Sequence, residues 1–389
     1  MKAFELFPEQ VAAIVGALTL DELAFRFRRQ IDGMSFASTL FDAPLGADGL
    51  NLNDAERDGC ALRAKEFFGW RDLDMAHGPT ATLGGWSAAL AHAGRRRLTE
   101  LTFVAAGRGD QRVVARHAAS DIFADAAAVS SLTYGRRRLL SFVSPHSLLG
   151  FTLTVLTPNL QQIEALDMRG MSPEKLNKTL SFGDVVVATP SLWRYLIQEG
   201  ARAPDNVMAV YFGEAMSREL AKDMRDKGFS AQREVYGSTE TGLIGWRDSP
   251  GEPFRLFEAM QREGDAVVRR FADGRSAPIE TPDLIEWQEA RTFNLGARRD
   301  GAVQIGAVNV FPDRIAAVIG AHEDVSTCRI EVGRHSGGFD RLIAHIELKE
   351  GSPLNERRAR SIDRHCRDML LPHERPRIYR FADGEAKDR

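Results

Sequence analysis

Cysteine is scarce in this chain, and the three that occur, Cys60, Cys328 and Cys366, lie far apart without Cys-x-x-Cys spacing. An odd number of widely separated cysteines argues against a disulfide framework or a zinc site and favours a reducing cytoplasm. Excess charge of one sign is also missing, because 51 basic and 54 acidic residues leave a formal net charge of −3. No general electrostatic field therefore draws this chain to nucleic acid or to an anionic membrane.

Long apolar runs are absent as well. Charge and Pro8 interrupt the N-terminal sequence before a span of about 20 apolar residues is reached. We therefore expect neither a signal peptide nor an integral membrane segment. What the chain has is length and apolar content: 389 residues with 43% hydrophobic side chains. At roughly 100–200 residues per domain, two or three domains with a sizeable core are expected.

The apolar pattern changes along the chain and predicts an α/β fold. Apolar side chains at three- and four-residue spacing predict a helical N-terminal segment over residues 1–97. Short apolar runs then alternate with amphipathic stretches, which predicts a largely parallel sheet covered by helices. These runs lie at 101–105, 184–189, 207–212 and 234–236.

The sequence after residue 252 predicts different structure. Short alternating runs there are typical of antiparallel strands. From residue 301 a strand–helix–strand pattern follows, with its clearest strand at 341–349 and a helix opened by Pro353 and running to Met369.

One short run carries most of the chemistry: Tyr-Gly-Ser-Thr-Glu-Thr-Gly at 236–242, directly after Val235. Glycines allow a tight turn and a close approach to a ligand, and hydroxyls donate to phosphate oxygens. A carboxylate such as Glu240 binds Mg²⁺, which keeps most of its water. A nucleotide phosphate with its metal explains all three residue types, whereas a polar turn between strand and helix is the simpler alternative.

This run resembles the Tyr-Gly-x-Thr-Glu signature of the adenylate-forming superfamily of acyl- and aryl-CoA ligases and adenylation domains. Further similar segments follow the family's order over residues 98–389. They are Pro145-His146 with Gly150, 187–193, Gly213-Glu214-Ala215, Thr281-Pro-Asp283-Leu, Arg298-Arg-Asp300 and 304–312. The resemblance implies a large α/β AMP-binding domain at 98–299 and a small mobile α+β C-terminal domain at 300–389.

The resemblance also implies ATP/AMP and Mg²⁺ as cofactors, a carboxylic acid as substrate, and CoA or an acyl carrier protein as acceptor. Thr239 would contact the α-phosphate and Glu240 would hold Mg²⁺, with Gly237 and Ser238 in the same phosphate-binding turn. Asp283 and Arg298 would bind the ribose. Asp300 would be the pivot of the C-terminal domain. Its remaining assignments are Gly213, Glu214, Ala215 and Tyr236 around the adenine, His146 beside the acyl carboxylate, and Lys387 as the terminal lysine that bridges carboxylate and α-phosphate.

Simpler structural roles stand beside several of these assignments. Asp283 is also suited to capping a turn, and Arg298 to a place on the surface. His146 also fits a buried, hydrogen-bonded histidine, and Trp193 is more typical of a core residue than of a ligand contact. The arginine runs at 95–97 and 136–138 are typical of solvated surface, with binding of phosphate or of an acidic carrier protein as the alternative.

The chain departs from the family at its phosphate loop. After the apolar run at 101–104, the family's serine and threonine hydroxyls are replaced by Ala105-Ala-Gly107-Arg-Gly109-Asp-Gln-Arg112. Gly107 and Gly109 can still form an anion nest from backbone amides, and Arg112 takes the lysine position. Asp110, however, brings a like charge toward the triphosphate.

Two functions follow from this pattern. The first is ATP-dependent ligation of an aromatic acid, such as a hydroxybenzoate or hydroxycinnamate, to CoA or a carrier-protein thiol. The compact layout is most similar to the aryl-acid ligases of aryl polyene or xanthomonadin-type pigment synthesis. The second is a degenerate homologue that binds nucleotide or a partner without efficient turnover. A scaffolding subunit without a nucleotide site is a third, less favoured possibility.

Overall fold

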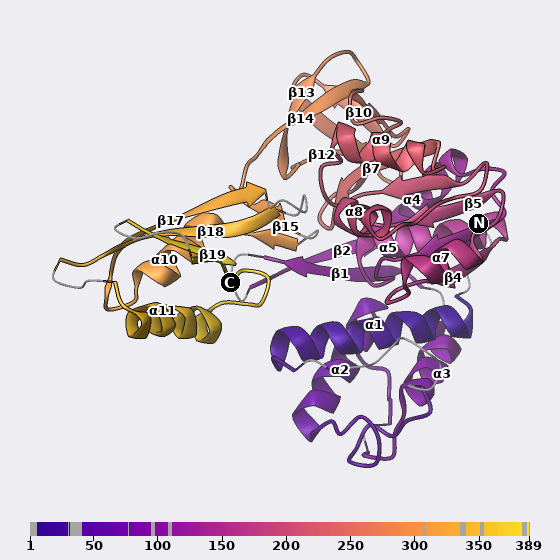
Figure 1. Ribbon diagram of the computed structural model, residues 1–389. Coiled ribbons are helices and arrows are strands. Elements are labelled where there is room, and N and C mark those ends of the chain that lie inside the picture. The colour runs from indigo at the N-terminus through magenta and orange to yellow at the C-terminus, as the bar shows by residue number, and fades with distance from the viewer. Residues whose placement is uncertain are drawn as a thin grey trace.

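The computed structural model describes residues 6–29, 31, 41–76, 78–94, 98–107, 111–305, 308–334, 340–350, 354–382 and 387–388. The predicted N-terminal helices are present as α1 (Pro8–Arg26), α2 (Asp54–Phe67) and α3 (Leu83–Gly94). They form the indigo group below the sheet in Figure 1. Pro8 occupies the first turn of α1. A reciprocal pair of hydrogen bonds between Asn53 and Glu56, each 2.9 Å long, caps the start of α2.

A nine-stranded sheet with the order β13-β14-β9-β8-β7-β6-β5-β3-β4 forms the centre of the molecule. Its parallel half, as the alternation of apolar runs predicted, consists of β3 (Arg138–Ser141), β4 (Glu164–Asp167), β5 (Asp184–Val187), β6 (Met208–Tyr211) and β7 (Ala231–Ser238). Its antiparallel half consists of β8 (Gly242–Arg247), β9 (Phe254–Leu256), β13 (Asp283–Trp287) and β14 (Thr292–Arg298).

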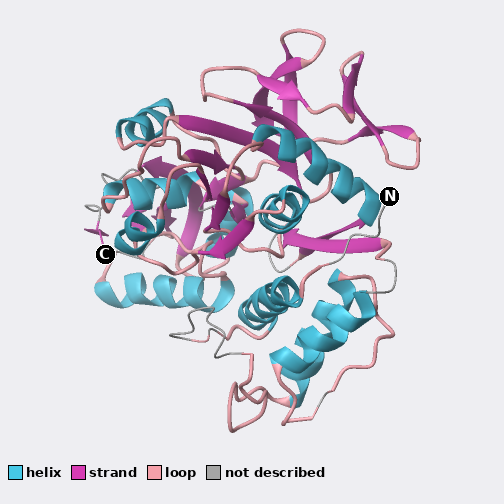
Figure 2. Cartoon of the chain, turned by 90° about the vertical axis from the view of Figure 1, so that its right-hand side faces the viewer, coloured by secondary structure: helices cyan, strands magenta, loops and turns pink. Residues whose placement is uncertain are grey.

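Both faces of the central parallel strands β5 and β6 are buried. Successive side chains of a strand point to opposite faces, so Val185 and Val187 pack into one apolar cluster and Val186 into another. The Val186 face is covered by α7 (Pro173–Thr179), α8 (Pro190–Gln198) and α9 (Arg218–Asp226), and it contains Trp193, which is fully buried core as expected. The other face is covered by α4 (Ala119–Leu132), α5 (Leu148–Phe151), the π-helical η2 (Thr152–Leu156) and α6 (Thr157–Gln161). Figure 2 shows the sheet flanked by these helices.

The expectation that residues 101–105 belong to the parallel sheet is wrong. They lie in β1 (Glu100–Ala106), which pairs antiparallel with β2 (Arg112–Ala118) in a separate two-stranded hairpin. Only residues 107–111 separate the two strands, whereas a parallel connection needs a crossover of about a dozen residues or more. β1 therefore pairs with β2 and does not join the parallel sheet.

The predicted antiparallel strands after residue 252 are confirmed. Besides β9, they include a three-stranded sheet of β10 (Met260–Glu263), β11 (Ala266–Arg270) and β12 (Ser276–Ile279). This sheet stands next to β13 and β14 at the top of Figure 1.

The C-terminal part forms a smaller α+β layer on one side of the large sheet (Figure 1). It contains β15 (Val303–Ile305), β16 (Val308–Val310), α10 (Pro312–Gly320), β17 (Val325–Arg334), β18 (Asp340–Leu348), α11 (Glu356–Met369), β19 (Ile378–Phe381) and β20 (Lys387–Asp388). Asn355 caps α11, so this helix begins at Glu356, while Pro353 lies outside the described residues. Ile315, Ile346 and Ile362 contribute to its own apolar core.

The arginine run at 136–138 lies at the amino end of β3, and its outer members bind protein groups. Arg138 donates to the fully buried carboxylate of Asp184 at 2.7 and 3.0 Å, and Arg136 donates to the carbonyl of Asn206 at 2.8 Å. The other run, at 95–97, lies outside the described residues. Among the helices that the structure describes, none combines the length and apolarity needed to cross a membrane.

Candidate active site

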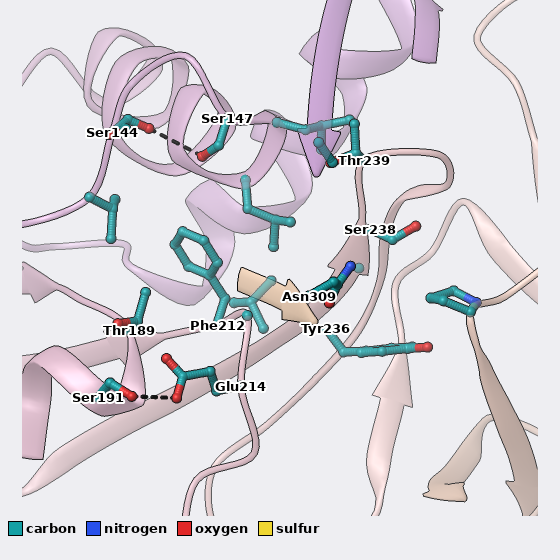
Figure 3. A pocket seen from close by; sticks show the side chains of 18 of the residues that line it. Ser144, Ser147, Thr189, Ser191, Phe212, Glu214, Tyr236, Ser238, Thr239 and Asn309 are labelled. Carbon is teal, nitrogen blue, oxygen red and sulfur yellow. Dashed lines mark hydrogen bonds between the residues drawn. The ribbon is translucent and has the colours of Figure 1, made fainter. Parts of the chain in front are cut away.

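A cavity of about 1370 Å³ lies where the parallel strands end. Open α/β sheets bind ligands at the carboxyl edge of their strands, and the segments after β3, β5, β6 and β7 all line this space. Other walls come from α1, β13, β14, β16 and the turn after α11. Figure 3 shows side chains from several of these elements converging on it.

The structure brings together most residues that the sequence analysis singled out. Those lining the cavity are Arg112, His146, Gly213, Glu214, Ala215, Tyr236, Gly237, Ser238, Thr239, Glu240, Asp283 and Arg298. Gly107 is buried and closes the β1–β2 hairpin by donating to the Gln111 carbonyl at 3.0 Å, so it is not part of the wall. Gly109 lies outside the described residues, and for Lys387 only the backbone is described, paired with Tyr379.

Tyr236 and Asp283 form a polar contact on one wall. The Tyr236 hydroxyl donates to Asp283 Oδ2 at 2.8 Å, while its ring packs against Phe254 and Phe293 with centroids 5.6 and 6.0 Å apart. Burial and the neighbouring carboxylate raise the pKa of Tyr236, so the phenol stays protonated and donates. Asp283 thus faces the cavity with a fixed carboxylate and does not merely cap a turn.

Asp283 stands opposite Arg298 in the β13–β14 register. The guanidinium of Arg298 donates to Asp300 at 2.7 and 2.9 Å, and these bonds lower the pKa of Asp300. An arginine and two carboxylates therefore meet at the point where β14 leads into the C-terminal layer.

The turn between β7 and β8 carries Thr239 and Glu240. Ser238 and Thr241 close it: their hydroxyl oxygens lie 3.0 Å apart, and the backbone N–H of Ser238 donates to Thr241 Oγ1 at 3.2 Å. His117 Nε2 lies 2.7 Å from the Thr239 carbonyl, so the ring carries its proton on Nε2. The turn leaves the Glu240 carboxylate exposed and Thr239 half-buried at the cavity.

A buried ion pair lies directly beneath this turn. Arg269 and Asp125, each 2–3% exposed, are joined at 2.9 Å. Arg269 also donates to the Thr241 carbonyl at 2.6 Å, and the Leu243 N–H donates to Asp125 at 3.0 Å. Gly242 has φ +74°, and a Cβ there would collide with both charged groups, so the pair requires glycine at this position.

The wall after β6 is equally constrained. Gly213 has φ +89°, a left-handed conformation that favours glycine. The Ser191 hydroxyl donates to Glu214 at 2.5 Å, a contact drawn in Figure 3, and so fixes the carboxylate against α8. The polar side chains of this wall are therefore held in place before any ligand arrives.

His146 presents an unusual imidazole. Its Nδ1 is enclosed and has no hydrogen-bond partner among the described residues, which does not fit the alternative of a hydrogen-bonded core histidine. Burial lowers the pKa of His146 to about 4, with Arg63, Arg112 and Arg169 acting in the same direction. The ring is therefore neutral near pH 7.

No protein-family model matches the chain. Two curated relatives are named 4-coumarate–CoA ligase. That of Halorhodospira halophila is 25% identical over 96% of this chain and 95% of its own length; that of Rhodobacter capsulatus is 30% identical over 64% of each. The solved structure of an amide bond synthetase from Marinactinospora thermotolerans superposes with a TM-score of 0.59 at 16% identity, covering 73% of this chain and 65% of that one.

The chain is therefore similar in sequence to these ligases, and its fold is that of the adenylate-forming enzymes. The ordered motifs of the sequence agree with this similarity. Residues 98–107 and 111–112, which stand in place of the superfamily's phosphate loop, form the β1–β2 hairpin described above.

The charge of Arg112 is already paired. Its guanidinium contacts Glu22 at 2.8 Å and Asp21 at 3.3 Å and lies 3.9 Å from the centre of the Phe25 ring. The sequence predicted that Arg112 takes the place of a phosphate-binding lysine. The structure directs its donors to α1 instead.

Two groups of site residues were missed by the sequence analysis. The helix α1 was treated as part of a separate N-terminal segment, yet Asp21 and Phe25 line the cavity. His117, Asp125 and Arg269 reach the Thr239 turn from three distant segments, and only the two-residue spacing of Val267 and Arg269 on β11 offered a sign that Arg269 is buried.

The buried pair predicts a stability change that depends on pH. Burial raises the pKa of Asp125 to about 6 even beside Arg269, and Arg269→Met should raise it further. The substitution leaves an unpaired buried carboxylate, so we expect a loss of about 3–5 kcal/mol at alkaline pH. The loss should shrink as pH falls toward about 6, because the unpaired carboxyl of the variant, with its higher pKa, then binds a proton in the folded state. It should change little below about 6, where the wild-type carboxyl also binds a proton.

Urea unfolding of wild type and Arg269→Met across this pH range measures the effect. Arg270→Met, which removes the exposed neighbouring charge, should change stability by no more than about 0.5 kcal/mol. Equal losses in the two variants would show that the pair does not hold the turn.

The neutral state of His146 is also open to measurement. Its pKa in the folded protein lies below the unfolded value of about 6.5. The stability of wild type relative to His146→Gln should therefore be constant above about pH 6.5 and decline as pH falls through about 4. NMR of ¹³C-labelled histidine should give a midpoint near 4 for the resonance lost in His146→Gln, and a midpoint near 6.5 would show that the enclosed imidazole is not desolvated.

Proposed function

We propose that this protein activates a carboxylic acid with ATP and passes the acyl group to a thiol of CoA or of an acyl carrier protein. In the first step a carboxylate oxygen bonds to the α-phosphorus and pyrophosphate leaves. In the second, the thiol sulfur bonds to the acyl carbon, the thiol loses its proton and AMP leaves. The observation that carries the proposal is the meeting of Asp283, Tyr236 and the Thr239 turn in one cavity.

The geometry of these walls supports the nucleotide roles that the resemblance implies. The fixed carboxylate of Asp283 accepts from both ribose hydroxyls, and Arg298 lies beside it. Thr239 donates to the α-phosphate from a turn that the buried ion pair holds rigid, with Gly237 and Ser238 shaping its approach. The backbone of Gly213, Glu214 and Ala215 and the ring of Tyr236 enclose the adenine. Such preorganised donors stabilise developing charge without rearrangement.

The single carboxylate of Glu240 fits Mg²⁺ rather than a metal caged by protein. It is exposed at the cavity, and the described residues contain no group of three potential metal ligands. Mg²⁺ is commonly held by one or two carboxylates together with substrate phosphates. When bound, the ion would spread the charge of the triphosphate.

The acid subsite favours an aromatic acid. Apolar side chains after β3, on α5 and after β6 line this part of the cavity, among them Phe142, Leu149 and Phe212. The named activity of the two relatives supports a hydroxycinnamate-like or hydroxybenzoate-like acid. A role as a compact aryl-acid ligase in pigment synthesis is the narrower form of this proposal.

The C-terminal layer is proposed to move between the two steps. Residues 300–389 would rotate as a small domain against residues 98–299, with Asp300 as the pivot. Asn309 and His373 already reach the cavity from this layer, and rotation would bring Lys387 between the acyl carboxylate and the α-phosphate. Closures of this kind are common where one site serves successive steps.

The altered phosphate loop favours a second candidate function, the binding of nucleotide or a partner without efficient turnover. Its support is the pairing of Arg112 with Asp21 and Glu22, which leaves this side chain committed to α1. A protein of this kind would bind AMP but show no gain from the β- and γ-phosphates of ATP.

ATP–pyrophosphate exchange with 4-coumarate or 4-hydroxybenzoate distinguishes these functions. We expect exchange in wild type and a loss in Asp283→Asn, which cannot accept both ribose hydroxyls equally well. Losing one hydrogen bond to a charged group, ~1.5–3 kcal/mol, corresponds to roughly a 10- to 150-fold weaker nucleotide affinity.

The matched control is Glu280→Gln, which alters an exposed carboxylate near the start of β13 and should keep wild-type exchange. AMP binding without exchange for any aromatic acid would favour the second candidate. The absence of both AMP binding and exchange would refute the proposed function.

A further inference from the structure

Among the described residues of the N-terminal segment, Arg63 is the buried charged group with the fewest hydrogen bonds relative to its donors. It lies in α2, only 5% exposed, and none of its three guanidinium nitrogens has a hydrogen-bond partner among the described residues. A guanidinium has five N–H donors, and a buried cation is normally paired and hydrogen-bonded. An acceptor that is not part of the chain is therefore expected to complete it.

The position of Arg63 on α2 directs it toward the cavity wall. Phe67, one turn further along the same face, packs against Phe103 of β1 and Phe151 of α5, with ring centroids 5.3 and 5.5 Å away. Cys60, one turn before, contacts the Thr19 carbonyl of α1 at 3.8 Å. Arg63 thus lies on the face of α2 that packs against α1, β1 and α5.

The charges that act on Arg63 belong to this wall. Asp21, Glu22 and Arg112 are among them, and Arg63 in turn acts on His146. Asp21, Arg112 and His146 all line the cavity. Arg63 therefore stands beside the part of the cavity that contains His146, although it does not itself line the open space in this conformation.

Two observations at this wall point to an anionic ligand. Arg112 and Arg169 are paired with carboxylates, at 2.8 Å to Glu22 and 2.5 Å to Asp167, whereas the described residues provide no hydrogen-bonded partner for Arg63. The enclosed Nδ1 of His146 also has no hydrogen-bond partner in the described part of the chain. The Arg63 guanidinium and Nδ1 of the neutral His146 ring both lack hydrogen-bond partners among the described residues. A small anion with two oxygen atoms could bind both groups, one oxygen to each.

Asp21 is the residue of this wall that a ligand could displace. Its side chain is 37% exposed, and its contact with Arg112, at 3.3 Å, is longer than that of Glu22. An entering carboxylate would repel Asp21 and take its place next to the arginines. The exchange leaves the number of negative charges facing Arg63 unchanged and adds the hydrogen bonds that the guanidinium lacks.

We propose that Arg63 is a binding residue of the acid subsite and receives the carboxylate of the substrate acid beside His146. This inference rests on the proposed function, because it requires that the cavity binds a carboxylic acid in addition to the nucleotide. It also supplies a cationic partner for that acid from a segment that precedes the AMP-binding motifs.

The test compares thermal unfolding and calorimetric binding in wild type, Arg63→Met and Arg63→Lys. Without ligand, Arg63→Met should melt at the wild-type temperature or above it, because an unpaired buried cation is replaced by an apolar side chain of similar length. With 4-coumarate, the wild type should be stabilised, and Arg63→Met should bind the acid at least tenfold more weakly. Arg63→Lys should be intermediate, since it keeps the charge but loses the planar fork.

Three controls make the result specific. Arg71→Met, which removes an exposed charge of the same segment, should bind 4-coumarate like wild type. The neutral amide of 4-coumarate should bind wild type and Arg63→Met equally. AMP binding should be the same in both, so that loss of AMP binding in wild type itself would refute the proposed function, not this assignment.

Several outcomes would overturn the assignment of Arg63. Wild-type affinity for 4-coumarate in Arg63→Met would show that the guanidinium is satisfied by internal water alone. A melting temperature several degrees lower in both unliganded variants would show a structural role. Stabilisation of wild type by inorganic phosphate, lost in Arg63→Met and not reproduced by the acid, would show that the site serves a phosphate.

Discussion

The ion pair between Asp125 and Arg269 holds the one turn on which the candidate active site depends. The two residues are 144 positions apart in the chain and almost completely buried, and together they bind the backbone on both sides of Gly242. Removing either partner would leave an unpaired charge in the interior, which is strongly unfavourable. The ion pair therefore restricts the conformation of the turn that carries Thr239 and Glu240.

From this constraint the arrangement of the cavity follows. β7 delivers Tyr236 to the wall and then reverses into β8, which leads through β9 to β14 and β13 with Arg298 and Asp283. The hydroxyl of Tyr236 joins the two halves of the sheet by binding Asp283. His117 adds the β1–β2 hairpin to the same assembly through the Thr239 carbonyl. Segments from four parts of the chain thus fix the Asp283 carboxylate and the Thr239 turn, which both face the cavity.

The sequence allowed much of this to be predicted, because its strongest signals are local. The fully buried strands β5 and β6 and the carboxyl-edge segments around Gly213, Tyr236 and Asp283 follow from apolar runs and short motifs. What was missed depends on long-range contacts. The hairpin formed by β1 is determined by its partner strand, and Asp21 and Asp125 become site residues only through packing of helices on the sheet.

Two polar groups with incomplete hydrogen bonding lie near the cavity. His146 is a half-buried ring with one unbonded nitrogen, and Arg63 is a buried cation without a hydrogen bond in the described structure. Both oppose folding, since burial of incomplete polar groups costs free energy. Proteins retain such groups mainly where function requires them.

A crystal structure with AMP and 4-coumarate bound tests the central claim most directly. The account predicts the ribose hydroxyls within hydrogen-bonding distance of Asp283, the α-phosphate at the Thr239 hydroxyl, and the Asp125–Arg269 pair intact beneath the turn. A nucleotide bound elsewhere, or one whose sugar and phosphate contact neither Asp283 nor Thr239, would contradict it.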